Sequence, residues 1–265
     1  MELETFMKQI NLPKEEQAFI QHYPISKETL AKSREKRQTG YPALGEFLQS
    51  KTPEEALVIV TNLASEYLKS YQEKGYSKEI FLANFLDITI WAKRYHLLEG
   101  KIGLMEANWV IRPFYFYHFR LGRLQFEPSK LQAILPKITK GIFCLQVHIP
   151  EDGPLLPKDC QASLETATLF FKDFFAGKKV FLCDSWLLSP SLKKLLPSSS
   201  HILAFQRRFT LLKTNYQSSQ AEERVFGQVL KDPRAYQATT TLARNLQEFL
   251  LSGGKVGESL GYFIL

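Results

Sequence analysis

The sequence predicts an α+β protein, in which an all-helical first part precedes a mixed β-sheet with helices on its faces. Apolar residues recur at helical spacing through much of the first half, whereas after residue 118 they form short runs typical of strands. Those runs alternate with amphipathic segments, which favours a mixed sheet. We therefore expect two domains, a helical one over residues 1–118 and a sheet domain over residues 119–265.

Two strong helix signals lie in the first half. The segment Thr52–Glu55 (TPEE) has a threonine suited to the N-cap, a proline at the first helical position and a glutamate at the third, which is a capping box. The apolar residues that follow predict one helix through Tyr71, which Gly75 ends. Ser77 can cap a second helix that runs towards Gly100.

The clearest signal in the second half is the stretch 141–175. A nearly continuous apolar run from Ile142 to Ile149 predicts a central strand, and the Asp152–Pro154 step predicts a turn. Pro157 fits the first turn of the amphipathic helix that follows. The junction of a strand end with a helix N-terminus presents backbone N–H groups and the positive end of the helix dipole, so it favours an anion.

Further strands are expected at 119–127, 179–183, 202–212 and 260–265, and a last helix at 235–251. The segment 119–127 alternates apolar and polar residues apart from Gly122, which predicts one half-buried strand. Gln206, Arg207 and Arg208 are expected at exposed positions of an edge strand, where they could contact an anion.

The composition limits the function classes. The net charge of +7 and the pI of about 9.2 suit either a polyanion or one phosphate-bearing cofactor, and no nucleic-acid motif supports the first. No apolar run is long enough to span a bilayer and the N-terminal stretch is too acidic for a signal peptide, so a cytoplasmic protein without a membrane partner is expected. The three cysteines lack zinc-site spacing, so we expect reduced thiols and no metal. The sequence leaves the oligomeric state open.

Four segments, together with the helical leader, resemble a family of bacterial acyltransferase-like proteins: FRLGRLQFE (119–127), VHIPEDGPL (147–155), CDSWLLSPSLKKLLP (183–197) and ILAFQRRF (202–209). The resemblance implies a helical N-terminal domain and a C-terminal domain similar to the GNAT N-acetyltransferases. It also implies an N-acyltransferase that moves an acyl group from acetyl-CoA or another acyl-CoA to an amine, carried by a small molecule or a protein.

In the larger GNAT superfamily the acyl-CoA pyrophosphate binds backbone N–H groups between a central strand and the next helix. The usual signature there is Gln or Arg, two residues, Gly, one residue, then Gly or Ala. This chain departs from it, since residues 149–155 (IPEDGPL) hold one glycine, two prolines that remove donors, and two acids that would repel phosphate. By the resemblance, the cofactor contacts are expected at Ile149, Gly153, Leu155, Leu156 and Lys158.

Direct acyl transfer requires a general base, a donor to the developing oxyanion and a proton for the departing thiolate. Glu127, His148 and Asp184 each end an expected strand and could act as the base, and Ser185 could protonate the thiolate. Each also has a structural interpretation, as a solvated strand end, a satisfied sheet residue, a loop acceptor or a cap.

The alternative function is a non-catalytic ligand-binding or protein-interaction module that retains the GNAT-like fold. A vacant, positively biased groove at the 150–158 turn favours the enzyme, whereas Glu151 or Asp152 filling that groove favours the module.

Overall fold

The computed structural model describes residues 1–131, 141–175 and 177–265, and its contacts divide the chain into two compact units. Unit 1 comprises Met1–Leu121 together with Pro150–Asp152. Unit 2 comprises Gly122–Ile149 and Gly153–Leu265. Three residues of the predicted turn after the central strand therefore group with the first unit, although the strand and the helix beside them belong to the second.

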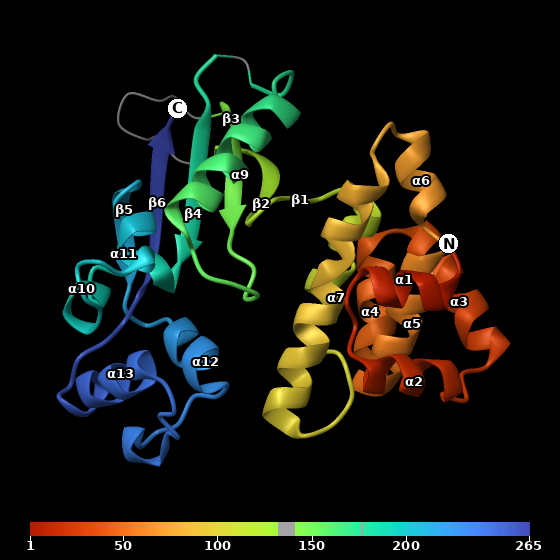
Figure 1. The fold of residues 1–265 in the computed structure, drawn as a ribbon, viewed down its shortest axis with the longest axis horizontal. Helices are drawn as coiled ribbons and strands as arrows, with labels where there is room; N and C mark the ends of the chain where they lie inside the picture. Colours follow the sequence, from red (N-terminus) through yellow and green to blue (C-terminus); the bar gives the residue numbers. More distant parts are fainter. Residues whose placement is uncertain (132–140, 176) are drawn as a thin grey trace. The chain divides into compact units, whose positions relative to one another are not determined.

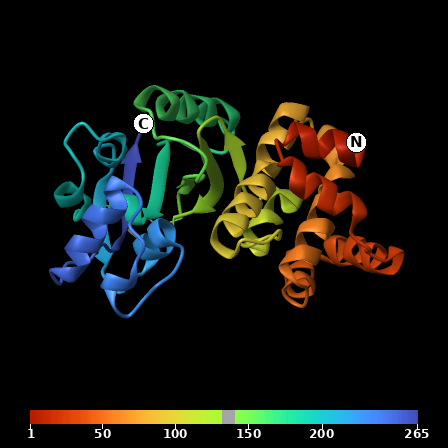
Figure 2. The same cartoon turned by 60° about the horizontal axis from the view of Figure 1, so that its bottom comes forward.

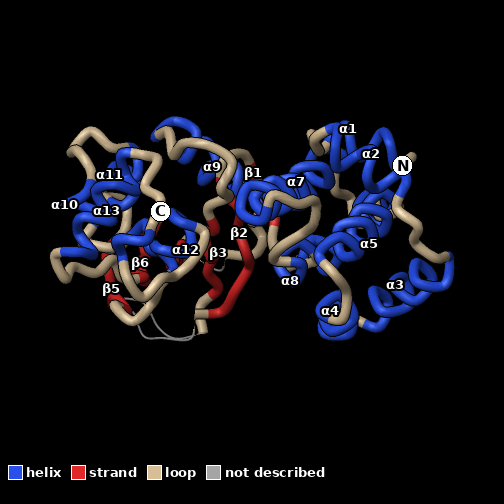
Figure 3. The backbone as a smooth tube through the Cα atoms, turned by 90° about the horizontal axis from the view of Figure 1, so that it is seen from below, coloured by secondary structure: helices blue, strands red, loops and turns tan. Residues whose placement is uncertain are grey.

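Unit 1 is helical apart from one short strand (Figures 1 and 3). Its elements are α1 (Leu3–Gln9), α2 (Lys14–His22), α3 (Lys27–Thr39), α4 (Tyr41–Gln49), α5 (Pro53–Ser65), α6 (Leu68–Glu73), α7 (Lys78–Glu99), α8 (Ala107–Val110), the 3-10 helix η1 (Arg112–Tyr115) and β1 (Phe119–Leu121). Helix α5 is buried along most of its length, so it forms the centre of this unit's core.

The predicted caps in unit 1 are confirmed. Thr52 Oγ1 accepts from the Glu55 N–H, and Glu55 Oε2 accepts from the Thr52 N–H. Ser77 Oγ accepts from the Ile80 N–H at the start of α7, and Gly100, with a φ of 64°, ends that helix. The single helix predicted through Tyr71 is wrong, because the chain breaks into α5 and α6.

Unit 2 contains β2 (Leu124–Lys130), β3 (Phe143–His148), α9 (Pro157–Phe170), β4 (Val180–Ser185), η2 (Trp186–Leu188), α10 (Leu192–Leu195), α11 (His201–Gln206), β5 (Thr210–Asn215), α12 (Gln220–Phe226), η3 (Pro233–Ala235), α13 (Thr241–Leu251) and β6 (Glu258–Ile264). Its strands are neighbours in the order β2-β3-β4-β6-β5. Strands β3 and β4 are parallel and the other pairs are antiparallel, which confirms the predicted mixed sheet and the α+β class.

Helix α9 covers one face of this sheet (Figures 1 and 2). Aromatic side chains fill the core there: Phe181 is fully buried, its ring stacks on Phe263 with centroids 4.9 Å apart, and Phe126 meets it edge-on at 6.1 Å. The ring of Phe209, just after α11, packs on Phe263. Large apolar side chains from three strands thus fix the sheet beneath α9.

Three predicted elements of the sheet domain differ from the structure. The strand predicted at 119–127 is two strands separated by a turn, which Gly122 permits with a φ of 77°. The strand predicted at 202–212 begins instead as α11, in which Leu203 and Phe205 are both buried, and continues as β5 only from Thr210. The last helix starts at Thr241, where the Thr240 side chain caps it.

Within the described part of the chain, no helix is both long and apolar enough to cross a membrane.

Candidate functional site

The central feature of unit 2 is the place where its two parallel strands part. The pairing of β3 with β4 ends at Gln146 and Leu182. Strand β3 continues to His148 and β4 continues to Ser185, so the carboxyl ends of both strands extend beyond their last paired residues. Ligands of open sheets bind beyond the carboxyl ends of parallel strands, which makes this opening the candidate site.

The structure brings together two of the predicted catalytic residues at this opening. His148 Nε2 lies 3.0 Å from Glu127 Oε2, and the two side chains are 27% and 24% exposed. Their contact follows from the register, because Glu127 of β2 is opposite Gln146 of β3, and His148 is the next residue of β3 on the same face. The pair is accessible to a ligand and held by two paired strands.

Asp184 lies on this same face, since Leu182 pairs with Gln146 and Asp184 is the next residue of β4 that faces the same way. Partial desolvation raises the pKa of the Asp184 carboxyl, and the negative charge of Glu258 raises it further. The positive charge of Lys213 lowers this pKa, but by less. Ser185 is on the opposite face, and its Oγ accepts from the Leu187 N–H as the cap of η2. The sheet thus separates Ser185 from the other three candidates.

The loop between β3 and α9 presents backbone donors. Among the described residues, no acceptor is bonded to the N–H groups of Gly153, Leu155, Leu156 and Lys158, whereas those of Asp159 and Cys160 bond to the Leu156 carbonyl. These four donors lie at and just before the N-terminus of the 14-residue helix α9. A helix N-terminus with open N–H groups is suited to phosphate, so the residues present fit the acyl-CoA pyrophosphate despite the atypical signature.

Positive charge surrounds the first turn of α9. Lys158 is exposed there, and Arg208 donates to Gln161 Oε1 at 2.7 Å. Burial raises the pKa of the Cys160 thiol, whereas the positive charges of Arg123 and Arg208 lower it. Both arginines are therefore near this turn. The edge-strand prediction for residues 206–208 is wrong, because Gln206 ends α11 and is buried, and Arg208 contacts α9.

The two acids of the loop face arginines. Arg94 Nη1 of α7 lies 2.9 Å from Glu151 Oε1, and Arg120 Nη2 of β1 lies 2.7 Å from Asp152 Oδ2. The expected repulsion of phosphate by free carboxylates is therefore reduced, because each acid has a cationic partner.

The carbonyl groups that follow in the loop are also bound. Arg123 donates to the carbonyl oxygens of Gly153 at 2.5 Å and Pro154 at 3.0 Å. Sequence reasoning missed Arg94, Arg120 and Arg123. Two of the three lie in the 119–127 segment that it singled out, but no spacing pattern links that segment to the loop.

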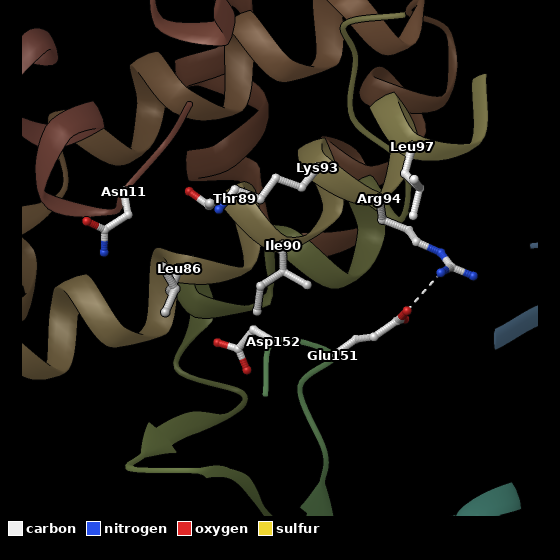
Figure 4. Close-up of a pocket in the computed structure, with 9 residues that line it drawn as sticks. All are labelled: Asn11, Leu86, Thr89, Ile90, Lys93, Arg94, Leu97, Glu151 and Asp152. Carbon is white, nitrogen blue, oxygen red and sulfur yellow. Dashed lines mark hydrogen bonds and ion pairs between the residues drawn. The ribbon is translucent and has the colours of Figure 1, made fainter. Parts of the chain in front are cut away.

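A cavity of about 400 Å³ lies in unit 1, beside α7 (Figure 4). Leu86, Ile90 and Leu97 supply apolar wall, and the exposed Lys93 supplies a positive charge. Glu151 and Asp152 form part of the same wall (Figure 4). The cavity is therefore amphipathic.

The described residues contain no group of three or more His, Cys, Asp or Glu side chains placed to hold a metal ion.

Comparisons with known proteins agree with this architecture. The model of a GNAT-like C-terminal domain matches residues 118–263, and that of an N-acyltransferase N-terminal domain matches residues 1–116. The expected GNAT-like C-terminal domain is thereby confirmed. Among proteins of curated function, none matches the chain.

Three solved structures resemble the chain at 20% sequence identity. An acyltransferase in complex with decanoyl-CoA and teicoplanin has a TM-score of 0.80, with 100% of this chain and 88% of that chain covered. An acyltransferase in complex with CoA and 10C-teicoplanin has a TM-score of 0.79, with 98% and 87% covered. An acyltransferase in complex with decanoyl-CoA has a TM-score of 0.77, with 97% and 85% covered. At this identity the likeness establishes the fold.

Proposed function

Because the chain belongs to the family that joins an N-acyltransferase N-terminal domain to a GNAT-like C-terminal domain, we propose that it is an acyl-CoA-dependent N-acyltransferase. The observation that carries the proposal is the opening between β3 and β4, next to a loop whose backbone donors have no acceptor among the described residues. A half-buried pair of catalytic type, Glu127 and His148, lies at the end of β3.

The N–H groups of Gly153, Leu155, Leu156 and Lys158 are our candidates for binding the pyrophosphate, with the Lys158 side chain as a further cation. Ile149 is the first residue after β3, at the start of this loop, and we include it in the same proposed site. The acyl-CoA complexes of the similar acyltransferases support a thioester of this kind as the co-substrate.

His148 is our candidate for the general base. A neutral imidazole that donates its Nε2–H to Glu127 carries its lone pair on Nδ1, where it can accept a proton. Glu127 then stabilises the imidazolium that forms. Asp184, on the same face and with a raised pKa, is the alternative base. Ser185 is a weaker candidate for proton donor, since it lies on the opposite face.

In the proposed reaction, the acceptor amine nitrogen forms a bond to the thioester carbonyl carbon, and the carbon–sulfur bond breaks. His148 Nδ1 accepts the proton that the amine loses, and the same proton is then returned from the imidazolium to the leaving thiolate, so the products are an amide and free CoA with a neutral imidazole restored. The chain's own contribution is to hold the pyrophosphate of acyl-CoA through backbone donors and to transfer the proton at a fixed imidazole.

We further propose that the acceptor is a small-molecule amine, which the teicoplanin complexes of the similar acyltransferases support. The cavity beside α7 is the candidate for its binding, because its wall combines apolar side chains of α7 with the carboxyl-bearing residues Glu151 and Asp152.

The test is a thiol-release assay with decanoyl-CoA and a panel of small amines and amine-bearing glycopeptides, with acylated products identified by mass spectrometry. Thiol release that depends on an amine, with a product heavier by one acyl group, is the expected result. Binding of decanoyl-CoA without amine-dependent release from any member of the panel would contradict the enzyme and favour the non-catalytic binding module.

A further inference from the structure

The acids of the loop between β3 and α9 are held from α7 and β1. We propose that Arg94 and Arg120 are positioning residues for acyl-CoA: by pairing with Glu151 and Asp152, they fix the loop so that its later N–H groups are available to the pyrophosphate. This inference rests on the proposed function and adds to it two residues that act on acyl-CoA through Glu151 and Asp152.

Arg120 is rigidly placed. Its side chain is 9% exposed, and its backbone N–H donates to Asn84 Oδ1 at 2.7 Å. Asn84 is itself fully buried on α7, where its amide donates to the Tyr71 hydroxyl. The guanidinium is therefore presented to Asp152 from a buried network, and a buried cation of this kind needs an anionic partner.

Arg94 holds the neighbouring residue of the loop from one face of α7. Its side chain is 12% exposed and that of Glu151 is 38% exposed (Figure 4). This ion pair is therefore more exposed to solvent than the pair of Arg120 with Asp152. Lys78 is on the same helix, does not line the cavity and has no ion-pair partner among the described residues. This second cation of α7 provides a control for the change of charge.

The rest of the loop follows the same pattern. Arg123 takes the carbonyl oxygens of Gly153 and Pro154, so three arginines bind two carboxylates and two carbonyl groups of four consecutive residues. These four acceptors are bound to arginine, whereas the N–H groups of Gly153, Leu155, Leu156 and Lys158 have no acceptor among the described residues. A site preorganised in this way binds an anion without having to order the loop first.

The positioning role and simple charge repulsion predict opposite effects for one substitution. Asp152→Asn removes a negative charge beside the phosphate site while nearly keeping the side chain's shape. If Asp152 only repels phosphate, this variant binds CoA more tightly than the wild type. If Asp152 is the anchor that Arg120 holds, the variant binds CoA about fivefold or more weakly, because the neutral amide is a poorer partner for the guanidinium.

The experiment is calorimetric titration with CoA of the wild type, Asp152→Asn and Asp159→Asn. Asp159 is the matched control, because it is an acid in the first turn of α9 and has no ion-pair partner among the described residues. We expect its variant to bind CoA as tightly as the wild type or more tightly. Equal or tighter binding by Asp152→Asn would overturn the inference.

The second pair is tested by charge reversal. Arg94→Glu should weaken CoA binding about tenfold, and the double variant Arg94→Glu with Glu151→Arg should restore it to within about threefold of the wild type. Lys78→Glu, with the same change of charge, should have less than a threefold effect. Equal weakening by Lys78→Glu, or no recovery in the double variant, would refute a specific contact.

A wild type that binds no CoA would instead remove the proposed function itself, so the two failures are distinguishable. Thermal melting of every variant, followed by circular dichroism, ensures that the comparison is between folded proteins.

Discussion

The Glu127–His148 pair gives the sharpest kinetic prediction. Glu127→Gln keeps the size of the side chain and removes its charge, while the cross-strand register that brings it to His148 stays unchanged. The glutamine can still accept the imidazole N–H through its neutral oxygen. The variant therefore removes charge stabilisation of the imidazolium and leaves most of the geometry.

The size of the effect follows from the contact. A hydrogen bond to a charged group contributes about 1.5–3 kcal/mol, and the lower end applies here because the two side chains, 27% and 24% exposed, are partly solvated. Since about 1.4 kcal/mol corresponds to a tenfold change in rate, kcat should fall about tenfold. Removal of the proposed base, in His148→Ala, should lower kcat by about 10²–10³.

The assay is thiol release at saturating decanoyl-CoA and saturating acceptor, with kcat and KM determined separately. Ser129→Ala is the control, because Ser129 Oγ accepts from Gln146 on the same face without contacting the pair. Its kcat should stay within about twofold of the wild type. The proposed role is refuted if Glu127→Gln leaves kcat unchanged, or if it raises only the KM for acyl-CoA.

Three further predictions concern stability and the alternative base. Phe181→Ala should lower the free energy of unfolding by about 3–5 kcal/mol in urea titrations, because the fully buried ring stacks on Phe263; a loss below about 1 kcal/mol would contradict that packing. Thr52→Ala should cost about 0.5–2 kcal/mol by the same measurement, through loss of the capping box, and an unchanged midpoint would count against the cap. Asp184 has a raised pKa in the folded state, so the folded protein binds more protons than the unfolded chain, and stability falls as pH rises above the carboxyl's ordinary value of 3.8. Asp184→Asn should therefore raise Tm at pH 7 relative to the wild type and have little effect near pH 3, whereas a lower Tm at pH 7 would reverse the assigned sign.

Local signals predicted the elements whose chemistry is local. The capping box at Thr52, the cap at Ser77 and the apolar run that became β3 are all specified by neighbouring residues, and each was found where the sequence placed it. The same holds for the start of α9 at Pro157, where proline favours the first helical position.

Elements whose structure depends on tertiary contacts were predicted less well from the sequence. Residues 202–212 contain neither glycine nor proline, so nothing local marks the change from α11 to β5. That change is fixed by burial of Leu203 and Phe205 and by the bond from Gln206 to the Ser189 carbonyl, none of which a local pattern encodes.

The candidate site shows the same division. Glu127 and His148 were expected at a common sheet edge, because each ends an apolar run, but their direct contact depends on the register of β2 against β3. The acids of the loop were expected to repel phosphate, and their partners Arg94 and Arg120 come from 57 and 32 residues away in the chain. Pairings at such separations cannot be deduced from spacing.

We propose that the loop before α9 binds acyl-CoA through its backbone donors, and calorimetric titration of the wild type, Gly153→Pro and Gly153→Ala with decanoyl-CoA tests this. Proline removes the N–H at this position, whereas alanine keeps it and finds no atom within 4 Å of its added carbon. We expect micromolar binding by the wild type, a change of less than about threefold for alanine, and binding at least about tenfold weaker for proline, the size expected for one hydrogen bond to a charged group. Equal affinity of all three proteins would place the thioester elsewhere, and no binding by the wild type would contradict the claim outright.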